Sequence, residues 1–217
     1  MYKRQVDNCF ATPYLQQPIK YGADLVIHSA TKLLDGQGRT MGGITVGSEN
    51  LIDTIYRFAR ITGPSLSPFN AWTISKSIET LAVRVDRHCD NALQLATALE
   101  AHPKVKKVRY PFLPSHPQYE LAKKQMKAGG NIVTIQLDGD VTTGRNFLNA
   151  IQMCSLTANL GDSRTIVSHP ASTTHAKLLP EERAQVGIAD SLIRISVGLE
   201  HIEDIQQDII QALDTLK

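Results

Sequence analysis

The stretch Ala23-Asp-Leu-Val-Ile-His-Ser-Ala-Thr-Lys32 decides the fold, because it joins a buried strand to a lysine. Leu25, Val26 and Ile27 are consecutive apolar residues, a pattern typical of a strand covered on both faces in a parallel sheet. A lysine at the end of such a strand is partly removed from water, which favours its neutral, nucleophilic form. The stretch therefore predicts an α/β fold with a reactive amine, that of Lys32, at the carboxyl end of a strand.

The residues around Lys32 suit a cofactor that carries an aldehyde on a pyridine ring. Such a cofactor needs a lysine for its carbonyl, an anion for its ring nitrogen and hydroxyls for its phosphate. Asp7 follows a short apolar stretch upstream, and Ser29 and Thr31 stand just before the lysine. The motif alone leaves a second interpretation open, because Ser-x-Thr-Lys is a common tetrapeptide and a lysine after a strand is usually a solvated loop residue.

The composition is that of a globular protein rather than a nucleic-acid-binding or membrane-spanning one. The chain has 217 residues, enough for one large domain or two small ones, with 42% hydrophobic and 20% charged residues. The formal net charge is +2 and no basic stripe interleaves with aromatic residues, so nucleic acid is not an expected partner. No apolar run approaches the roughly 20 residues that span a bilayer, so no membrane partner is expected.

The cysteines indicate free thiols in a reducing cytoplasm. Cys9, Cys89 and Cys154 are widely spaced and odd in number, without a disulfide or metal-ligand pattern. His169 and His175 flank a small polar loop, but no acidic or thiol residue stands nearby to complete a metal site. We therefore expect a cytoplasmic protein without a metal site.

The first part of the chain alternates strand-like and helix-like pieces, as expected of part of a parallel α/β sheet. The predicted strands are Val6–Phe10, Leu25–Ser29 and Gly43–Val46, with a short segment near Pro18–Tyr21 and a helix over Asn50–Arg60. Ser67 can cap, and Pro68 can open, one long helix that runs towards Ala101. We place a first domain at residues 1–85, a partial cofactor-binding domain with the start of this helix.

A separate α+β domain is expected over residues 86–217. Its predicted strands are Val105–Tyr110, Ile132–Leu137, Ile166–Val167 and Leu192–Val197. Its predicted helices are Gln118–Met126, Thr142–Ile151, Pro180–Val186 and Ile202–Leu216.

Two motifs, Val6-Asp-Asn-Cys-Phe-Ala-Thr-Pro13 and His28-Ser-Ala-Thr-Lys32, resemble the Cys/Met-metabolism family of pyridoxal-phosphate enzymes. The resemblance continues through His169-Pro-Ala-Ser-Thr-Thr-His175 and Leu192-Ile-Arg-Ile-Ser-Val-Gly-Leu-Glu200, so it covers residues 6–217. It implies the C-terminal part of the large domain of an aspartate-aminotransferase-like fold, followed by a smaller α+β domain. It also implies pyridoxal 5′-phosphate as the cofactor.

Three further motifs are most similar to the O-succinylhomoserine sulfhydrylase branch of this family: Leu33-Leu-Asp-Gly-Gln-Gly-Arg39, Gly63-Pro-Ser-Leu-Ser-Pro-Phe-Asn-Ala-Trp72 and Thr157-Ala-Asn-Leu-Gly-Asp162. The branch implies γ-replacement on an O-acylhomoserine, with sulfide as nucleophile and homocysteine as product. Cystathionine γ-synthase, γ-lyase or methionine γ-lyase chemistry is the alternative, and a non-catalytic fragment is another. The acyl group, succinyl or acetyl, and the nucleophile, sulfide or cysteine, stay open.

The resemblance implies a cofactor-binding role for four residues. Lys32 would bond the cofactor's carbonyl and then move protons between substrate carbons. Asp7 would pair with the protonated ring nitrogen, and Ser29 and Thr31 would donate hydrogen bonds to the phosphate. Each of the last three also has a structural alternative: Asp7 could cap a turn, and the two hydroxyls could satisfy backbone groups at the strand end.

Two more residues would bind the substrate. Arg194 would hold the α-carboxylate, for which the planar guanidinium is suited. Asn159, where lyases usually carry a serine, would help to orient the same carboxylate. A structural carboxylate could partner Arg194 instead, and Asn159 could belong to a turn.

Relative to this family, the chain lacks the upstream part of the cofactor domain, so we expect an N-terminal truncation. Family members are usually tetramers, which implies a homo-oligomer for the intact protein. Met1-Tyr-Lys-Arg-Gln5 is polar where a buried strand should lead into Val6, and it matches the peptide that a sequencing-library transposon end encodes in one reading frame. We therefore expect residues 1–5 not to be native coding sequence.

Overall fold

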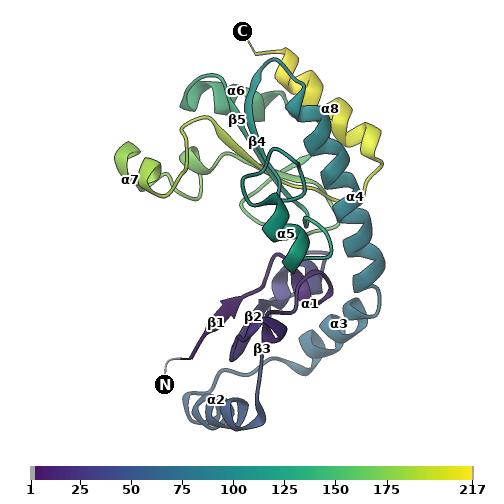
Figure 1. Cartoon of the computed structure of the whole chain (residues 1–217), viewed down its shortest axis with the longest axis vertical. Coiled ribbons are helices and arrows are strands. Elements are labelled where there is room, and N and C mark those ends of the chain that lie inside the picture. The colour runs from purple at the N-terminus through teal and green to yellow at the C-terminus, as the bar shows by residue number, and fades with distance from the viewer. Residues whose placement is uncertain (1–2, 217) are drawn as a thin grey trace.

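The computed structural model describes residues 3–216 and contains two β-sheets joined by a long helix (Figure 1). Residues 1 and 2, part of the segment that we expect not to be native, lie outside the described residues. The first sheet has the order β1-β2-β3, with β1 at Gln5–Asp7, β2 at Leu25–Ser29 and β3 at Gly43–Gly47.

Only half of the first sheet is parallel, which corrects the prediction of a parallel arrangement. β1 and β2 are parallel, whereas β3 runs antiparallel to β2. A parallel pair needs a crossover connection, usually a helix. The connection from β2 to β3 holds only the short turn Ala30–Leu34 and a loop, so the chain reverses direction.

The first predicted strand, Val6–Phe10, is shorter in the structure and ends at Asp7. Asn8 is buried and its side-chain amide donates to the carbonyls of Thr12 and Gln16, both at 3.0 Å. These bonds fold the chain into the short helix α1, Thr12–Leu15, and a 3₁₀ turn at Pro18–Tyr21 follows. The sequence pattern did not indicate α1.

The second sheet has the order β4-β5-β8-β7-β6. The strands are β4 Val105–Arg109, β5 Ile132–Leu137, β6 Ser155–Leu156, β7 Ile166–Ser168 and β8 Leu192–Ser196. The two central strands, β5 and β8, are antiparallel, and their alternate residues Val133, Ile135, Ile193 and Ile195 are fully buried. The intervening residues, including Arg194, are half-buried on the other face, as the period of a strand requires.

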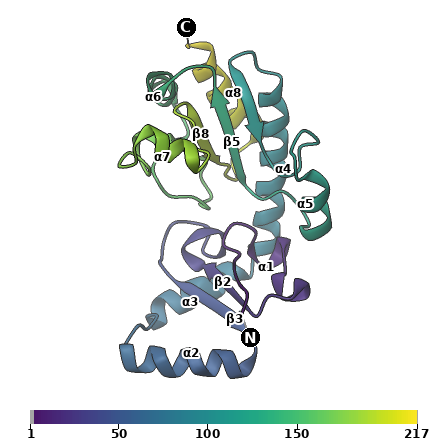
Figure 2. The same ribbon diagram turned by 60° about the vertical axis from the view of Figure 1, so that its left-hand side comes forward.

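Helices complete the two halves of the molecule. They are α2 Glu49–Thr62, α3 Pro68–Ile78, α4 Leu81–Glu100, α5 Tyr119–Gln125, α6 Val141–Ala150, α7 Pro180–Gln185 and α8 Ile202–Asp214. α4 contacts α1 and the Ala30–Leu34 turn near its start, and β4, β5 and α8 further along (Figure 2). The predicted domain boundary after residue 85 falls inside α4 and stays a prediction. In the described part of the chain, no helix has the length and apolarity of a membrane span.

The predicted long helix from Pro68 to Ala101 is broken into α3 and α4, which corrects that prediction. The start is as expected: Pro68 stands in the first turn and Ser67 accepts a hydrogen bond from the Asn70 amide at 3.1 Å. The break comes at Ser77, whose carbonyl accepts from the Thr80 amide, the Thr80 hydroxyl and the Arg84 guanidinium. These side-chain donors replace the regular helical ladder at this point.

A buried carboxylate anchors the last helix to the second sheet. Asp208 of α8 accepts hydrogen bonds from the backbone amides of Gln152, Met153 and Cys154 at 2.8, 3.0 and 2.8 Å. Burial alone would raise the pKa of Asp208, but these hydrogen bonds outweigh it and hold the pKa below its usual value of 3.8. Asp208 is therefore ionised at neutral pH and accepts from three successive backbone amides, of which that of Cys154 is buried.

We expect Asp208→Ala to lower the free energy of unfolding by about 2–4 kcal/mol, because the three amides lose their acceptor. The pKa of Asp208 is lower in the folded than in the unfolded state. The contribution of Asp208 to the free energy of unfolding is therefore complete above the unfolded-state pKa, and it is lost as the pH falls through the folded-state pKa. Urea unfolding at pH 7 and pH 3 measures both effects. Asp204→Ala, on an exposed face of the same helix, is the matched control and should cost less than about 1 kcal/mol. Equal losses in the two variants would contradict the anchoring role.

Candidate active site

Lys32 stands in a π-helical turn, Ala30–Leu34, directly after β2. The turn is closed by hydrogen bonds from the Asp35 amide to the Ala30 carbonyl at 2.9 Å and from the Gly36 amide to the Lys32 carbonyl at 2.8 Å. The Lys32 backbone is not helical, with φ −91° and ψ −134°. The lysine is half-buried, as the sequence predicted for the end of a buried strand.

The structure brings Lys32, Asn159 and Arg194 together from the two halves of the chain. The Lys32 amine donates to Asn159 Oδ1 at 2.8 Å. Arg194, on the outer face of β8, donates to the Ala158 carbonyl at 2.9 Å and to the Asn159 carbonyl at 3.4 Å. The loop at residues 158–159 therefore lies between an amine and a guanidinium.

Arg194 has no carboxylate within ion-pair distance among the described residues. Burial lowers its pKa, and no nearby charge opposes that effect. A half-buried guanidinium whose partners are neutral carbonyls is unfavourable unless an anion joins it. Within the described residues the structural-carboxylate alternative has no support, whereas an anionic ligand would complete the site.

Asp7 lies at the carboxyl end of β1, where the chain leaves the sheet beside β2. It pairs with Ile27 in register, and the Cys9 amide donates to its Oδ1 at 3.0 Å. Hydrogen bonds from the thiol and the amide of Cys9 hold the pKa of Asp7 below its usual value. The carboxylate is therefore ionised at neutral pH and exposed, which suits a partner for a protonated ring nitrogen.

Ser29 is the last residue of β2, and Thr31 directly precedes Lys32 in the turn that follows. Thr31 Oγ1 accepts from the Gly42 amide at 3.1 Å and is 3.4 Å from the Gly42 carbonyl, so this hydroxyl also ties the turn to the start of β3. Ser29 is half-buried and its backbone amide donates to Cys9 Sγ at 2.8 Å. Thr31 thus has part of the structural role that the sequence left open.

Cys9 belongs to the site although the sequence did not single it out. Its sulfur contacts the Ser29 amide, and its backbone contacts Asp7. Burial raises the pKa of the thiol and the Asp7 carboxylate adds to this, while the Lys32 cation opposes it. Cys9 therefore links the Asp7 carboxylate to the Ser29 backbone at the end of β2, and its place in the motif around Asp7 was the available signal.

A cavity of about 510 Å³ opens beside Asp7 and Cys9 and extends towards Arg109 and His116. Lys32, Asn159 and Arg194 are not among the residues that line it. The cavity therefore adjoins the site on the Asp7 side only. Among the described residues, no group of three or more histidine, cysteine or acidic side chains could hold a metal ion, and the three cysteines are free thiols.

The donor set fits a pyridine aldehyde phosphate and an amino acid. It offers a half-buried amine in a turn, an ionised carboxylate at a strand end, two hydroxyls that lie between them in the sequence, and a guanidinium without an anionic partner among the described residues. The first two groups suit the carbonyl and the ring nitrogen of the cofactor, and the last suits a substrate carboxylate.

Comparison with known proteins agrees with this chemistry. The model of one family, the Cys/Met metabolism PLP-dependent enzymes, matches residues 3–214. The chain belongs to this family. Its members depend on pyridoxal phosphate (PLP), and the α/β architecture of the chain is that of the C-terminal portion of their fold.

Relatives within the family have different activities. The chain is 50% identical to O-succinylhomoserine sulfhydrylase of Pseudomonas aeruginosa over 97% of its length, and 46% identical to L-methionine gamma-lyase of Porphyromonas gingivalis, also over 97%. It superposes on cystathionine gamma synthase of Xanthomonas oryzae with a TM-score of 0.94, at 36% identity, over 98% of this chain and 55% of that one. The chain spans about half the length of the curated relatives it matches, 52% and 53% in these two cases.

Proposed function

We propose that the chain provides the lysine-bearing part of a pyridoxal-phosphate enzyme that replaces the γ-substituent of an O-acylhomoserine. The observation that carries this proposal is the contact chain from the Lys32 amine through Asn159 to Arg194. In this contact chain an amine lies near a guanidinium that has no anionic partner among the described residues, an arrangement that suits binding of an α-amino acid.

Lys32, Asp7, Ser29 and Thr31 would hold the cofactor. Lys32 would bond its carbonyl, Asp7 would lie at its ring nitrogen, and the two hydroxyls would contact its phosphate. When bound, the cofactor supplies an electron sink for the carbanion formed at the substrate α-carbon. The ionised Asp7 carboxylate would favour the protonated form of the ring nitrogen through its negative charge.

The substrate would be oriented by Arg194 and Asn159. The Arg194 guanidinium would hold the α-carboxylate in a bidentate pair, and this fixes the amino acid with its α-carbon towards the lysine. The Asn159 carbonyl oxygen accepts from the Lys32 amine, so it holds that amine in one orientation while the lysine moves protons at the α- and β-carbons.

For the reaction itself, we propose that the bond between the γ-carbon and the ester oxygen of O-succinylhomoserine breaks, that succinate leaves, and that sulfide bonds to the γ-carbon, which gives homocysteine. The similarity to O-succinylhomoserine sulfhydrylase at 50% identity supports this choice. Elimination is the second candidate, because a methionine gamma-lyase is 46% identical. We further propose a homo-oligomer, a tetramer in the intact protein, in the cytoplasm.

A product assay separates these candidates. The chain is incubated with pyridoxal phosphate and O-succinylhomoserine, with and without sulfide, and the products are identified by mass spectrometry. We expect homocysteine only when sulfide is present. An oxoacid with ammonia in both samples would instead indicate elimination. Cofactor bonded to Lys32 without either product would indicate that the chain is a non-catalytic fragment, and O-acetylhomoserine in place of the succinyl ester tests the acyl group.

A further inference from the structure

The turn that carries Lys32 is held from two sides by residues outside it. The backbone at Lys32 departs from the helical geometry of its neighbours, with a φ of −91° and a ψ of −134°. Arg84 of α4 contacts the turn on one side, and Gly161 contacts it on the other. Neither residue has a role in the chemistry described above.

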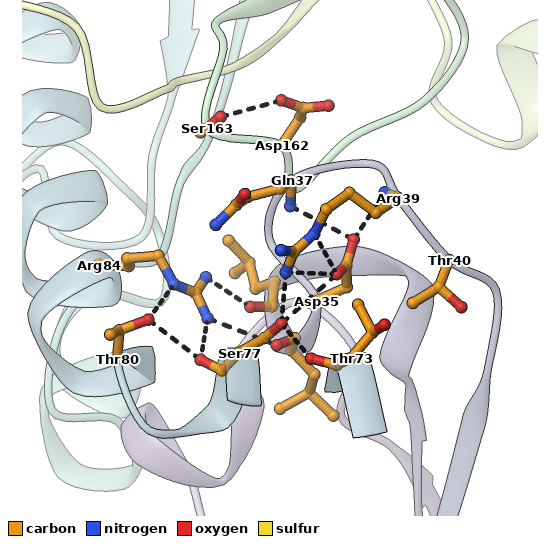
Figure 3. Close-up of polar contacts among 12 residues, drawn as sticks. Asp35, Gln37, Arg39, Thr40, Thr73, Ser77, Thr80, Arg84, Asp162 and Ser163 are labelled. Atoms are coloured by element: carbon orange, nitrogen blue, oxygen red, sulfur yellow. Dashed lines mark hydrogen bonds and ion pairs between the residues drawn. The ribbon is translucent and has the colours of Figure 1, made fainter. Parts of the chain in front are cut away.

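Arg84 is buried and all of its hydrogen bonds go to neutral acceptors. Its guanidinium donates to the carbonyls of Leu33 at 2.8 Å, Leu34 at 3.4 Å and Ser77 at 2.9 Å, and to the Thr80 hydroxyl at 3.1 Å (Figure 3). Burial lowers the pKa of Arg84, and it forms no ion pair within the described residues. Burial of the Arg84 guanidinium is unfavourable in free energy. Its hydrogen bonds hold the carbonyls of Leu33 and Leu34, the two residues that directly follow Lys32.

Gly36 leaves room for this guanidinium. It has a φ of +70°, and a Cβ at this position would overlap Arg84 Nη1. Only a glycine therefore lets the chain turn here and admits the arginine to the Leu33 carbonyl. The contact between Arg84 and the turn therefore depends on the backbone conformation of Gly36.

Gly161 packs against the opposite side of the turn. A Cβ at this position, where φ is +76°, would lie 2.8 Å from the Leu33 nitrogen and 3.1 Å from Lys32 Cα. The Gly161 amide donates to Ser196 Oγ at 2.9 Å, which fixes the loop to the end of β8. The same loop supplies Asn159, so its close approach also sets the contact between Asn159 and the Lys32 amine.

We infer that Arg84 and Gly161 are positioning residues for Lys32, which together hold its turn against the Asn159 loop. Arg84 acts through the carbonyls of Leu33 and Leu34, and Gly161 acts by allowing backbone contact. The inference rests on the proposed role of Lys32, but it concerns the geometry of this chain and is tested without the cofactor.

The first readout is hydrogen exchange of the turn, measured by mass spectrometry of peptides that cover residues 30–36. Arg84→Lys keeps the charge and removes the forked geometry, so fewer carbonyls are held. We expect exchange of this segment to rise by about tenfold or more, while residues 132–137 in β5 exchange as before. Arg87→Lys, an exposed arginine on the same helix, is the matched control and should change neither segment.

The second readout is the reactivity of the Lys32 amine towards acetic anhydride, compared with that of the exposed Lys20 in the same digest. We expect Arg84→Lys to raise the labelling of Lys32 relative to Lys20, because the amine leaves Asn159 when the turn loosens. A purely structural role for Arg84 would lower the stability of the whole protein without changing this ratio. An unchanged ratio, or exchange within twofold at residues 30–36, would overturn the inference.

Gly161→Ala tests the same inference from the other side and leaves the packing of α4 intact. The added methyl group must push the Lys32 turn away, so we expect the same rise in exchange at residues 30–36 and in relative labelling of Lys32. If Arg84→Lys unfolds the protein as a whole, this variant decides: an unchanged turn in Gly161→Ala rejects the inference. Failure of the chain to bond pyridoxal phosphate would contradict the proposed function. Hydrogen exchange at residues 30–36 and the relative labelling of Lys32 would still test the positioning role, because neither measurement needs the cofactor.

Discussion

The Lys32→Ala variant is expected to lose all turnover and the absorbance band of lysine-bound pyridoxal phosphate, because no other amine stands in the same turn. Loss of the group that bonds the cofactor and moves the substrate protons removes both steps, so the rate should fall by at least about 10⁴-fold. The measurement is the absorbance spectrum after addition of the cofactor, followed by the product assay.

Lys20→Ala is the matched control for this result. Lys20 is exposed and belongs to the 3₁₀ turn Pro18–Tyr21 of the same half of the molecule. Its removal should leave the band and any turnover unchanged. Equal bands in Lys32→Ala and Lys20→Ala would show that the cofactor bonds surface lysines, and the proposed function would then be wrong for this chain.

The second large effect is expected from Arg194→Lys, which keeps the positive charge but replaces the forked donors of the guanidinium by a single ammonium group. A lysine cannot form the bidentate pair with a carboxylate, nor can it bond the carbonyls of Ala158 and Asn159 at the same time. We expect the affinity for O-succinylhomoserine to fall by roughly 10- to 100-fold, while the cofactor band in the absence of substrate stays as it is. Titration of the cofactor-loaded chain, followed by absorbance, measures this affinity.

A conservative change elsewhere controls for the loss of an arginine as such. Arg145 is exposed on α6, so Arg145→Lys should change the affinity for O-succinylhomoserine by less than twofold. An Arg194→Lys chain that binds the substrate as tightly as Arg145→Lys would show that the guanidinium serves the loop at Ala158 rather than the substrate carboxylate.

Local patterns predict much of the secondary structure because they report burial. The alternation in β5, with Val133 and Ile135 inside, and the apolar run in β2 mark strands whose partners lie far away in the sequence. The break between α3 and α4 was missed, because it arises from donors that Arg84 and Thr80 bring to the Ser77 carbonyl. Such long-range side-chain contacts leave no trace in hydrophobic periodicity.

The roles assigned to the candidate site residues stay predictions, and their geometry could be anticipated only in part. The family resemblance named Lys32, Asn159 and Arg194, but the contact between the Lys32 amine and Asn159 joins positions separated by 127 residues. No local rule yields such a contact. Cys9 and Gly161 were missed because each acts through a contact with backbone that lies far away in the sequence, at Ser29 and at Leu33.

The central claim is that Lys32 is the cofactor-bonding amine of a pyridoxal-phosphate site. The most direct test is to add pyridoxal phosphate to the chain, trap the bonded cofactor with borohydride and map the modified peptides by mass spectrometry. We expect the label on Lys32, and exposed lysines such as Lys20 should carry little of it. A label spread over the surface lysines, with Lys32 unmodified, would contradict the central claim.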